Sequence, residues 1–114
     1  MKTFLAALII GSIFFVHAAD LAPVVEIEED VYTYTNANNG AGPMWCGGST
    51  SLVRSGDQIF ASGLETVPDD KPLNNCRWVL WRRDSQGWKR WYVDDEGRTR
   101  EPAPLVSTGP GTVL

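Results

Sequence analysis

Few residues of this chain could carry acid–base or metal chemistry. The sequence contains a single histidine, His17, in an apolar N-terminal stretch that we expect to be removed. Without an imidazole, Ser-His-Asp and Cys-His arrangements and His-ligated zinc sites are excluded. Catalysis would have to use carboxylates, Arg, Tyr or Cys, and their spacing identifies no catalytic residue. The sequence also gives no reason to expect a metal site or a cofactor.

The segment "GPMWCGGST", residues 42–50, is a candidate ligand-binding surface. Glycines allow close approach to the backbone, and a Trp ring offers a flat apolar plate for a sugar ring. We therefore predict that Trp45 binds ligand, together with Glu65 and Arg77 from later strands. The alternative is that Trp45 packs against neighbouring structure.

The two cysteines, Cys46 and Cys76, are candidates for a disulfide, because cysteines in secreted domains are commonly bridged. Closing the loop between them would stabilise the fold by about 3 to 4 kcal/mol in the chain-entropy model. The bridge requires Cys46 to lie in an approach loop above the sheet. The alternative is a pair of free thiols.

The N-terminus has the composition of a signal peptide, which we place at residues 1–19. Lys2 precedes an uncharged apolar run over residues 4–16, and small residues follow it, as a cleavage site requires. The run is shorter than the about 20 residues that span a bilayer. We therefore expect a secreted or periplasmic protein with no stable membrane insertion after cleavage, and an acidic lead-in over residues 20–30.

The charge of the chain argues against a nucleic-acid partner. Its formal net charge is −4, whereas phosphate binding needs clustered Lys and Arg. A local basic cluster brackets an expected turn, and we interpret it as strand-end charge facing water. Its members are Arg82, Arg83, Lys89 and Arg90.

The remaining sequence is typical of an all-β domain. Val, Thr and aromatic residues are frequent, Gly and Pro punctuate them, and no helical apolar period follows the signal peptide. Alternating patterns predict four antiparallel strands. They cover residues 50–54, 58–65, 76–83 and 88–94, with a tight "SGD" turn between the first two. The third strand is apolar on both faces and needs cover on both.

A partial repeat predicts where that cover comes from. "APLVSTGPGTVL", residues 103–114, resembles "STSLVRSGDQIF", residues 49–60. Four strands followed by a second strand start are typical of a β-propeller. We therefore expect residues 31–102 to form a first blade with its approach loop, and residues 103–114 to begin a second blade. The chain would then be a fragment whose partners include further blades of the same polypeptide, and the alternative is a small standalone β domain.

The segments "NNGAGPMWCGGSTSLVRSGDQIFASGLE", "DDKPLNNCRW" and "RTREPAPL" resemble the first blade of secreted bacterial BNR-repeat, sialidase-like β-propeller proteins. The resemblance covers about residues 31–114. It implies a protein directed at extracellular carbohydrate, by glycan hydrolysis or lysis in the full-length protein. The alternatives are a non-catalytic propeller that binds carbohydrate or protein, and the standalone domain.

The resemblance also implies an Asp-box at the turn before the fourth strand. "RDSQGWKRW" places Asp84, Gly87 and Trp91 in matching order, but each spacing differs by one residue and the Thr is missing, so the box is degenerate. An Asp-box is a folding device and does not report catalysis.

One family feature is missing. Sialidases carry an arginine before the first blade's opening strand, where this sequence has Gly47-Gly48-Ser49. Glycine cannot make the bidentate guanidinium grip on a substrate carboxylate, which argues against sialic-acid hydrolysis. The other family catalytic groups would fall beyond Leu114, so whether the protein is an enzyme stays open.

Overall fold

The computed structural model describes residues 22–45 and 47–114, and this part of the chain contains strands, turns and loops but no helix. The all-β class is therefore confirmed for these residues. The predicted signal peptide, the first residues of the acidic lead-in and Cys46 lie outside the described residues.

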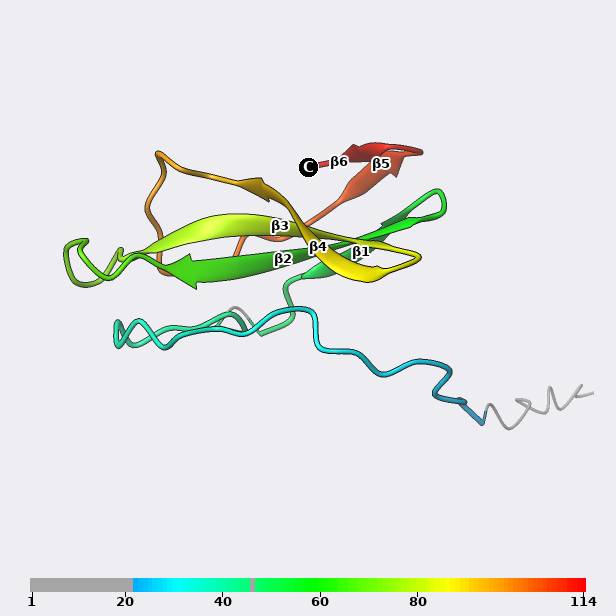
Figure 1. Cartoon of the computed structure of the whole chain (residues 1–114), viewed down its shortest axis with the longest axis horizontal. Helices are drawn as coiled ribbons and strands as arrows, with labels where there is room; N and C mark the ends of the chain where they lie inside the picture. Colours follow the sequence, from blue (N-terminus) through cyan, green and yellow to red (C-terminus); the bar gives the residue numbers. More distant parts are fainter. Residues whose placement is uncertain (1–21, 46) are drawn as a thin grey trace, which may run out of the picture.

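A four-stranded antiparallel meander forms the centre of the molecule (Figure 1). Each strand pairs with the next one in sequence, so the sheet order is the chain order. This confirms the predicted sheet, and the observed strands differ from the predicted ones by at most two residues at each end. They are β1 (Leu52–Ser55), β2 (Gln58–Thr66), β3 (Cys76–Asp84) and β4 (Gly87–Val93).

The two tight turns of the sheet use residues suited to their backbone. Gly56 follows β1 with a φ of 63° and Gly87 opens β4 with a φ of 99°, conformations that glycine adopts without steric cost. At the second turn the Asp84 carboxylate accepts a hydrogen bond from the Gln86 amide at 2.8 Å. Ser55 pairs directly with Gln58, so the predicted "SGD" hairpin is confirmed.

A C-terminal hairpin covers one face of the sheet. It consists of β5 (Ser107–Gly109) and β6 (Thr112–Val113), which form a separate two-stranded sheet above the meander in Figure 1. Leu105, just before β5, is buried in one cluster with Phe60 of β2 and Leu80 of β3. The apolar side chains of this face are therefore packed by the end of the chain.

The N-terminal segment, residues 31–39, lies along the opposite face (Figure 1). The Tyr32 ring stacks on Trp81 of β3, with ring centroids 5.2 Å apart and planes 9° from parallel. The Tyr32 hydroxyl accepts a hydrogen bond from the Leu64 amide at 3.2 Å. An added Cβ at Gly63 would lie 2.8 Å from the Tyr32 ring, so only glycine leaves room for this stack.

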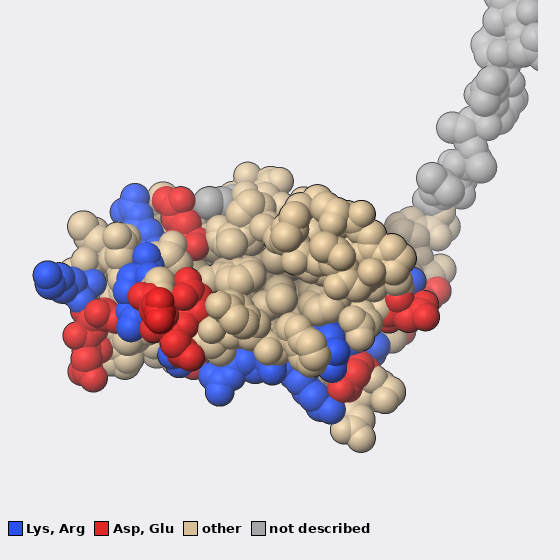
Figure 2. Space-filling model, turned by 90° about the horizontal axis from the view of Figure 1, so that it is seen from above, with Lys and Arg blue, Asp and Glu red and all other residues tan. Residues whose placement is uncertain are grey.

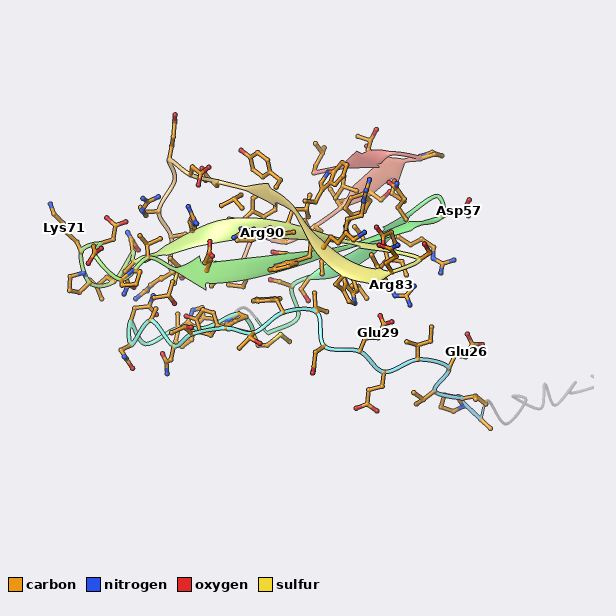
Figure 3. The ribbon with its side chains drawn as sticks, viewed as in Figure 1. Glu26, Glu29, Asp57, Lys71, Arg83 and Arg90 are labelled. Carbon is orange, nitrogen blue, oxygen red and sulfur yellow. The ribbon has the colours of Figure 1, made fainter. Side chains whose placement is uncertain are left out.

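An ion pair anchors the chain just before this segment, so the name N-terminal segment is used from here on for residues 29–39. The Arg83 guanidinium donates to both carboxylate oxygens of Glu29, with Nε–Oε2 at 2.6 Å and Nη2–Oε1 at 2.7 Å. Figure 3 shows Glu29 on the N-terminal segment beneath Arg83 of β3. Part of the acidic lead-in is therefore bound to the sheet.

A buried polar cluster surrounds Cys76 at the start of β3. Cys76 is fully buried, and its Sγ lies 3.7 Å from the Tyr34 hydroxyl and 3.6 Å from the Asn39 Nδ2. Asn39 also donates to the Asn75 side-chain oxygen at 2.9 Å. These contacts join the N-terminal segment to the loop between β2 and β3.

The two-sided cover that β3 was predicted to need is present in the described residues. On one face it comes from the second sheet, β5–β6, which lies within the residues predicted to supply it. On the other face it comes from the N-terminal segment, which was predicted only as part of the first blade with its approach loop. A propeller is not closed by the described residues.

Candidate functional site

An open pocket lies between the N-terminal segment and the β1–β2 end of the sheet. Its volume is about 280 Å³. Two tyrosines, Tyr32 and Tyr34, form one wall, and Met44 from the approach loop borders it. The remaining lining residues are Val31, Pro43, Ser51, Leu52, Ala61 and Ser62. Aromatic and apolar walls with a few hydroxyls are typical of small-ligand pockets.

The two tyrosines come from one extended stretch, "VYTYT", residues 31–35. Tyr32 and Tyr34 are two positions apart, so an extended backbone directs them to the same side. Burial raises the pKa of Tyr32 above its usual range, although the hydrogen bond from the Leu64 amide lowers it. Burial is also the main cause that raises the pKa of Tyr34, and the contact with Cys76 raises it further. Both phenols therefore remain protonated and neutral at physiological pH.

Trp45 follows Met44, which lines the pocket, in the sequence. Its backbone N–H donates to the Gly42 carbonyl at 3.0 Å, which closes a tight turn in the approach loop. Trp45 is 54% exposed and Met44 is 79% exposed. Large apolar side chains held out in solvent by an ordered turn are available for a ligand.

A second pocket, of about 290 Å³, lies between the N-terminal segment and strands β2, β3 and β4, and Tyr32 lines it as well. Its walls are more polar and carry Glu65 of β2 and Arg90 of β4. Its other lining residues are Thr33, Thr35, Leu64, Thr66, Val79 and Trp81.

Glu65 is held by two arginines. Arg77 Nε donates to the Glu65 carboxylate at 2.7 Å, and Arg90 Nη1 lies 3.2 Å from its other oxygen. Arg77 also pairs with Asp95 at 2.5 Å. The predicted pair of Glu65 and Arg77 is thus brought together on adjacent strands, where the two residues lie opposite each other.

Two carboxyls outside both pockets are fixed by ion pairs. The pKa values of Glu29 and Asp84 are lowered, chiefly because Arg83 and Lys89 hydrogen-bond them. No cluster of possible metal ligands occurs in the described residues. At the second pocket, Glu65 and its two arginines offer hydrogen-bonding groups that are held by their ion pairs.

The predicted site residues are only partly gathered. Glu65 lines the second pocket and pairs with Arg77, whereas Trp45 follows Met44, which lines the first pocket. Cys76 is a buried free thiol in the structure, and its predicted partner Cys46 lies outside the described residues, so the disulfide stays a prediction.

Two of the three residues assigned to the degenerate Asp-box lie at the turn between β3 and β4. Asp84 accepts the turn amide of Gln86, and Gly87 has the positive φ. Trp91 is 54% exposed, with the Arg82 guanidinium 3.5 Å from its ring centroid. It packs against a charged side chain of its own sheet.

Sequence reasoning missed Tyr32 and Tyr34, which line the first pocket. Their signal was present, because the alternation in "VYTYT" has the two-residue period of an extended segment with one packed face. The segment precedes the first regular strand, and its partners are distant in sequence, so the pattern alone did not show what it packs on.

No helix in the described residues is both long and apolar enough to cross a membrane. No protein-family model, no curated protein and no solved structure matches the chain.

Proposed function

We propose that this chain belongs to a secreted or periplasmic protein that binds extracellular carbohydrate through the surface formed by the N-terminal segment, the approach loop and β2. The observation that carries the proposal is the pocket lined by Tyr32, Tyr34 and Met44, with the exposed Trp45 next to Met44 in the approach loop. Aromatic rings pack against the apolar C–H face of a sugar, while nearby hydroxyls bond its polar edge.

The binding surface is the part of the function that these residues support. Glu65 pairs with Arg77 through one carboxylate oxygen and with Arg90 through the other. The proposal therefore uses Glu65 as a hydrogen-bonding group and assigns no catalytic carboxylate.

We further propose that the four-stranded sheet is the first blade of a sialidase-like β-propeller. The meander order and the Asp84 turn support this assignment. The intact mass of the native product tests it. A mass several times that of this chain is expected, and a mass matching residues 20–114 would contradict the proposal and favour a small standalone domain.

The binding proposal is tested with matched tryptophan variants. Trp45 and Trp91 are both 54% exposed, so Trp45→Ala and Trp91→Ala remove the same side chain at equal exposure. We expect Trp45→Ala to weaken binding by about tenfold, which is 1.4 kcal/mol. Trp91→Ala, outside both pockets, should leave affinity unchanged.

Isothermal titration calorimetry with cellotetraose, maltotetraose and N-acetylchitotetraose measures this difference. Circular dichroism of each variant checks that the fold is retained. If the two variants bound the sugar with equal affinity, whether unchanged or weakened, a binding site that includes Trp45 would be contradicted.

A further inference from the structure

We propose that the ligand is a linear, uncharged oligosaccharide whose neighbouring rings occupy the two pockets that Tyr32 lines. This inference rests on the proposed carbohydrate-binding function and specifies its ligand. It makes Tyr32 the residue that determines how a chain of sugars is positioned.

The first step is that the pockets are neighbours. They have comparable volumes, about 280 and 290 Å³, and share Tyr32 as a common wall. Strand β2 continues from one to the other, with Ala61 and Ser62 lining the first and Leu64 and Glu65 the second. A ligand that filled only one pocket would leave the other pocket unoccupied.

The second step is that Tyr32 is fixed. Its ring is stacked on Trp81, its hydroxyl bonds the Leu64 amide at 3.2 Å, and Gly63 lies beneath it without a Cβ. These contacts act on the ring and on its hydroxyl end. A wall held at both points is preorganised, so binding does not have to order it.

The third step is the difference in chemistry between the pockets. The first offers Tyr34, Met44 and other apolar groups for the face of a ring. The second offers Glu65 and Arg90, which are already paired at 3.2 Å. This pair presents acceptors and donors for hydroxyl groups. Together with Arg77 and its partner Asp95 it forms a cluster of two guanidinium groups and two carboxylates, which has no net formal charge and therefore favours an uncharged ligand.

A chain-length series tests the inference on the full chain. Affinities are measured by NMR titration for glucose against cellotetraose and maltotetraose, and for N-acetylglucosamine against N-acetylchitotetraose. We expect the tetrasaccharide that binds best to exceed its monosaccharide by at least about tenfold. Glu65→Gln and Arg90→Gln should each weaken tetrasaccharide binding and so remove most of that advantage. Glu101→Gln, in an exposed pair with Arg100 and outside both pockets, is the control and should change neither.

Two results would overturn the two-pocket inference while the binding function stood. They are equal affinities for monosaccharide and tetrasaccharide, and an unchanged tetrasaccharide affinity in the Glu65 and Arg90 variants, with Trp45→Ala still weakening binding. Tighter binding of an anionic chain, tested with dextran sulfate against dextran, would overturn the assignment of an uncharged ligand. Absence of binding to every sugar would overturn the binding function itself.

Discussion

At the scale of single residues, Gly63 controls how closely the N-terminal segment approaches the sheet. A Cβ at this position would lie 2.8 Å from the Tyr32 ring and 2.9 Å from the Trp81 indole nitrogen. Both neighbours are ring atoms of a stacked pair, so neither can move without disturbing the other. Gly63 therefore sets the geometry of the wall that the two pockets share.

We expect Gly63→Ala to lower the free energy of unfolding by about 1 to 3 kcal/mol, the usual cost of overpacking a filled site. The Tyr32–Trp81 stack should also loosen, which reduces the aromatic signal in near-ultraviolet circular dichroism. Gly109→Ala is the control, because no atom lies within 4 Å of an added Cβ there. Urea unfolding measures both variants, and an equal stability of the two would contradict the packing argument.

At the same scale, the sequence predicted contacts within the sheet better than contacts to it. Glu65 and Arg77 were expected to share a surface, and the register places them directly opposite each other on β2 and β3. Trp45 was expected on the same surface, but it lies in the approach loop directly after Met44, which lines the first pocket. Tyr32 was missed because its partner Trp81 belongs to a strand far along the chain, and side-chain alternation does not specify a distant partner.

At the scale of elements, the β5–β6 hairpin is attached to the sheet through a buried serine. The Ser55 hydroxyl donates to the Gly109 carbonyl at 2.6 Å and accepts from the Gly111 amide at 2.9 Å. Ser55 is 3% exposed, so water cannot easily replace these bonds. The hydroxyl therefore joins the β1–β2 turn to the turn of the hairpin.

Ser55→Ala should release this hairpin. The substitution leaves the Gly109 carbonyl and the Gly111 amide without their partner, at a cost of about 1 to 3 kcal/mol. We expect faster hydrogen exchange at Gly111, with the amides of β2 and β3 unchanged. Ser107→Ala is the matched control, because its hydroxyl makes only a 3.4 Å contact to the same carbonyl. Unchanged exchange at Gly111 in Ser55→Ala would show that the apolar contacts of Leu105 alone hold the hairpin.

The strands themselves were predictable because their signals are local. The β2 prediction ended at Glu65 and the strand ends at Thr66, while the β3 prediction ended at Arg83 and the strand ends at Asp84. The cover over the two faces was not predictable in the same way. Extended segments without regular pairing leave weak patterns, and their positions depend on tertiary contacts.

At the scale of the whole molecule, the sheet lies between the two ends of the chain (Figure 1), and the ends are held by different forces. The C-terminal side is attached by apolar contacts and by the Ser55 bonds. The N-terminal side combines the Tyr32 stack with the Glu29–Arg83 ion pair. Figure 2 shows that Lys and Arg line one long side of the face seen from above, while its centre carries few charges.

Because only the N-terminal side is held by the Glu29–Arg83 ion pair, we predict that acid weakens the attachment of that side and not of the C-terminal side. The hydrogen bond from Arg83 lowers the pKa of Glu29, so the pair stabilises the folded state above the unfolded pKa. That contribution is lost as the pH falls through the folded pKa, below the usual glutamate value of about 4.3. We expect acid to loosen residues 22–30 before the β5–β6 hairpin.

Proton NMR of this segment measures the response between about pH 6 and pH 3, a range that brackets the ordinary pKa values of carboxyl groups. Glu29→Gln should show the loosened state throughout this range. Glu28→Gln, a neighbouring exposed glutamate without an ion pair in the structure, should titrate like the wild type. Simultaneous release of both ends in acid would indicate that the sheet itself, rather than this ion pair, responds.

The same arrangement fixes an order of assembly during synthesis. The meander joins strands that follow one another along the chain, whereas Tyr32 bonds a residue 32 positions later and Glu29 one that is 54 positions later. Because long loops close at a greater entropic cost than short ones, the strands can pair before the ends dock. The N-terminal segment leaves the ribosome first, yet it can dock only after β3 has been made.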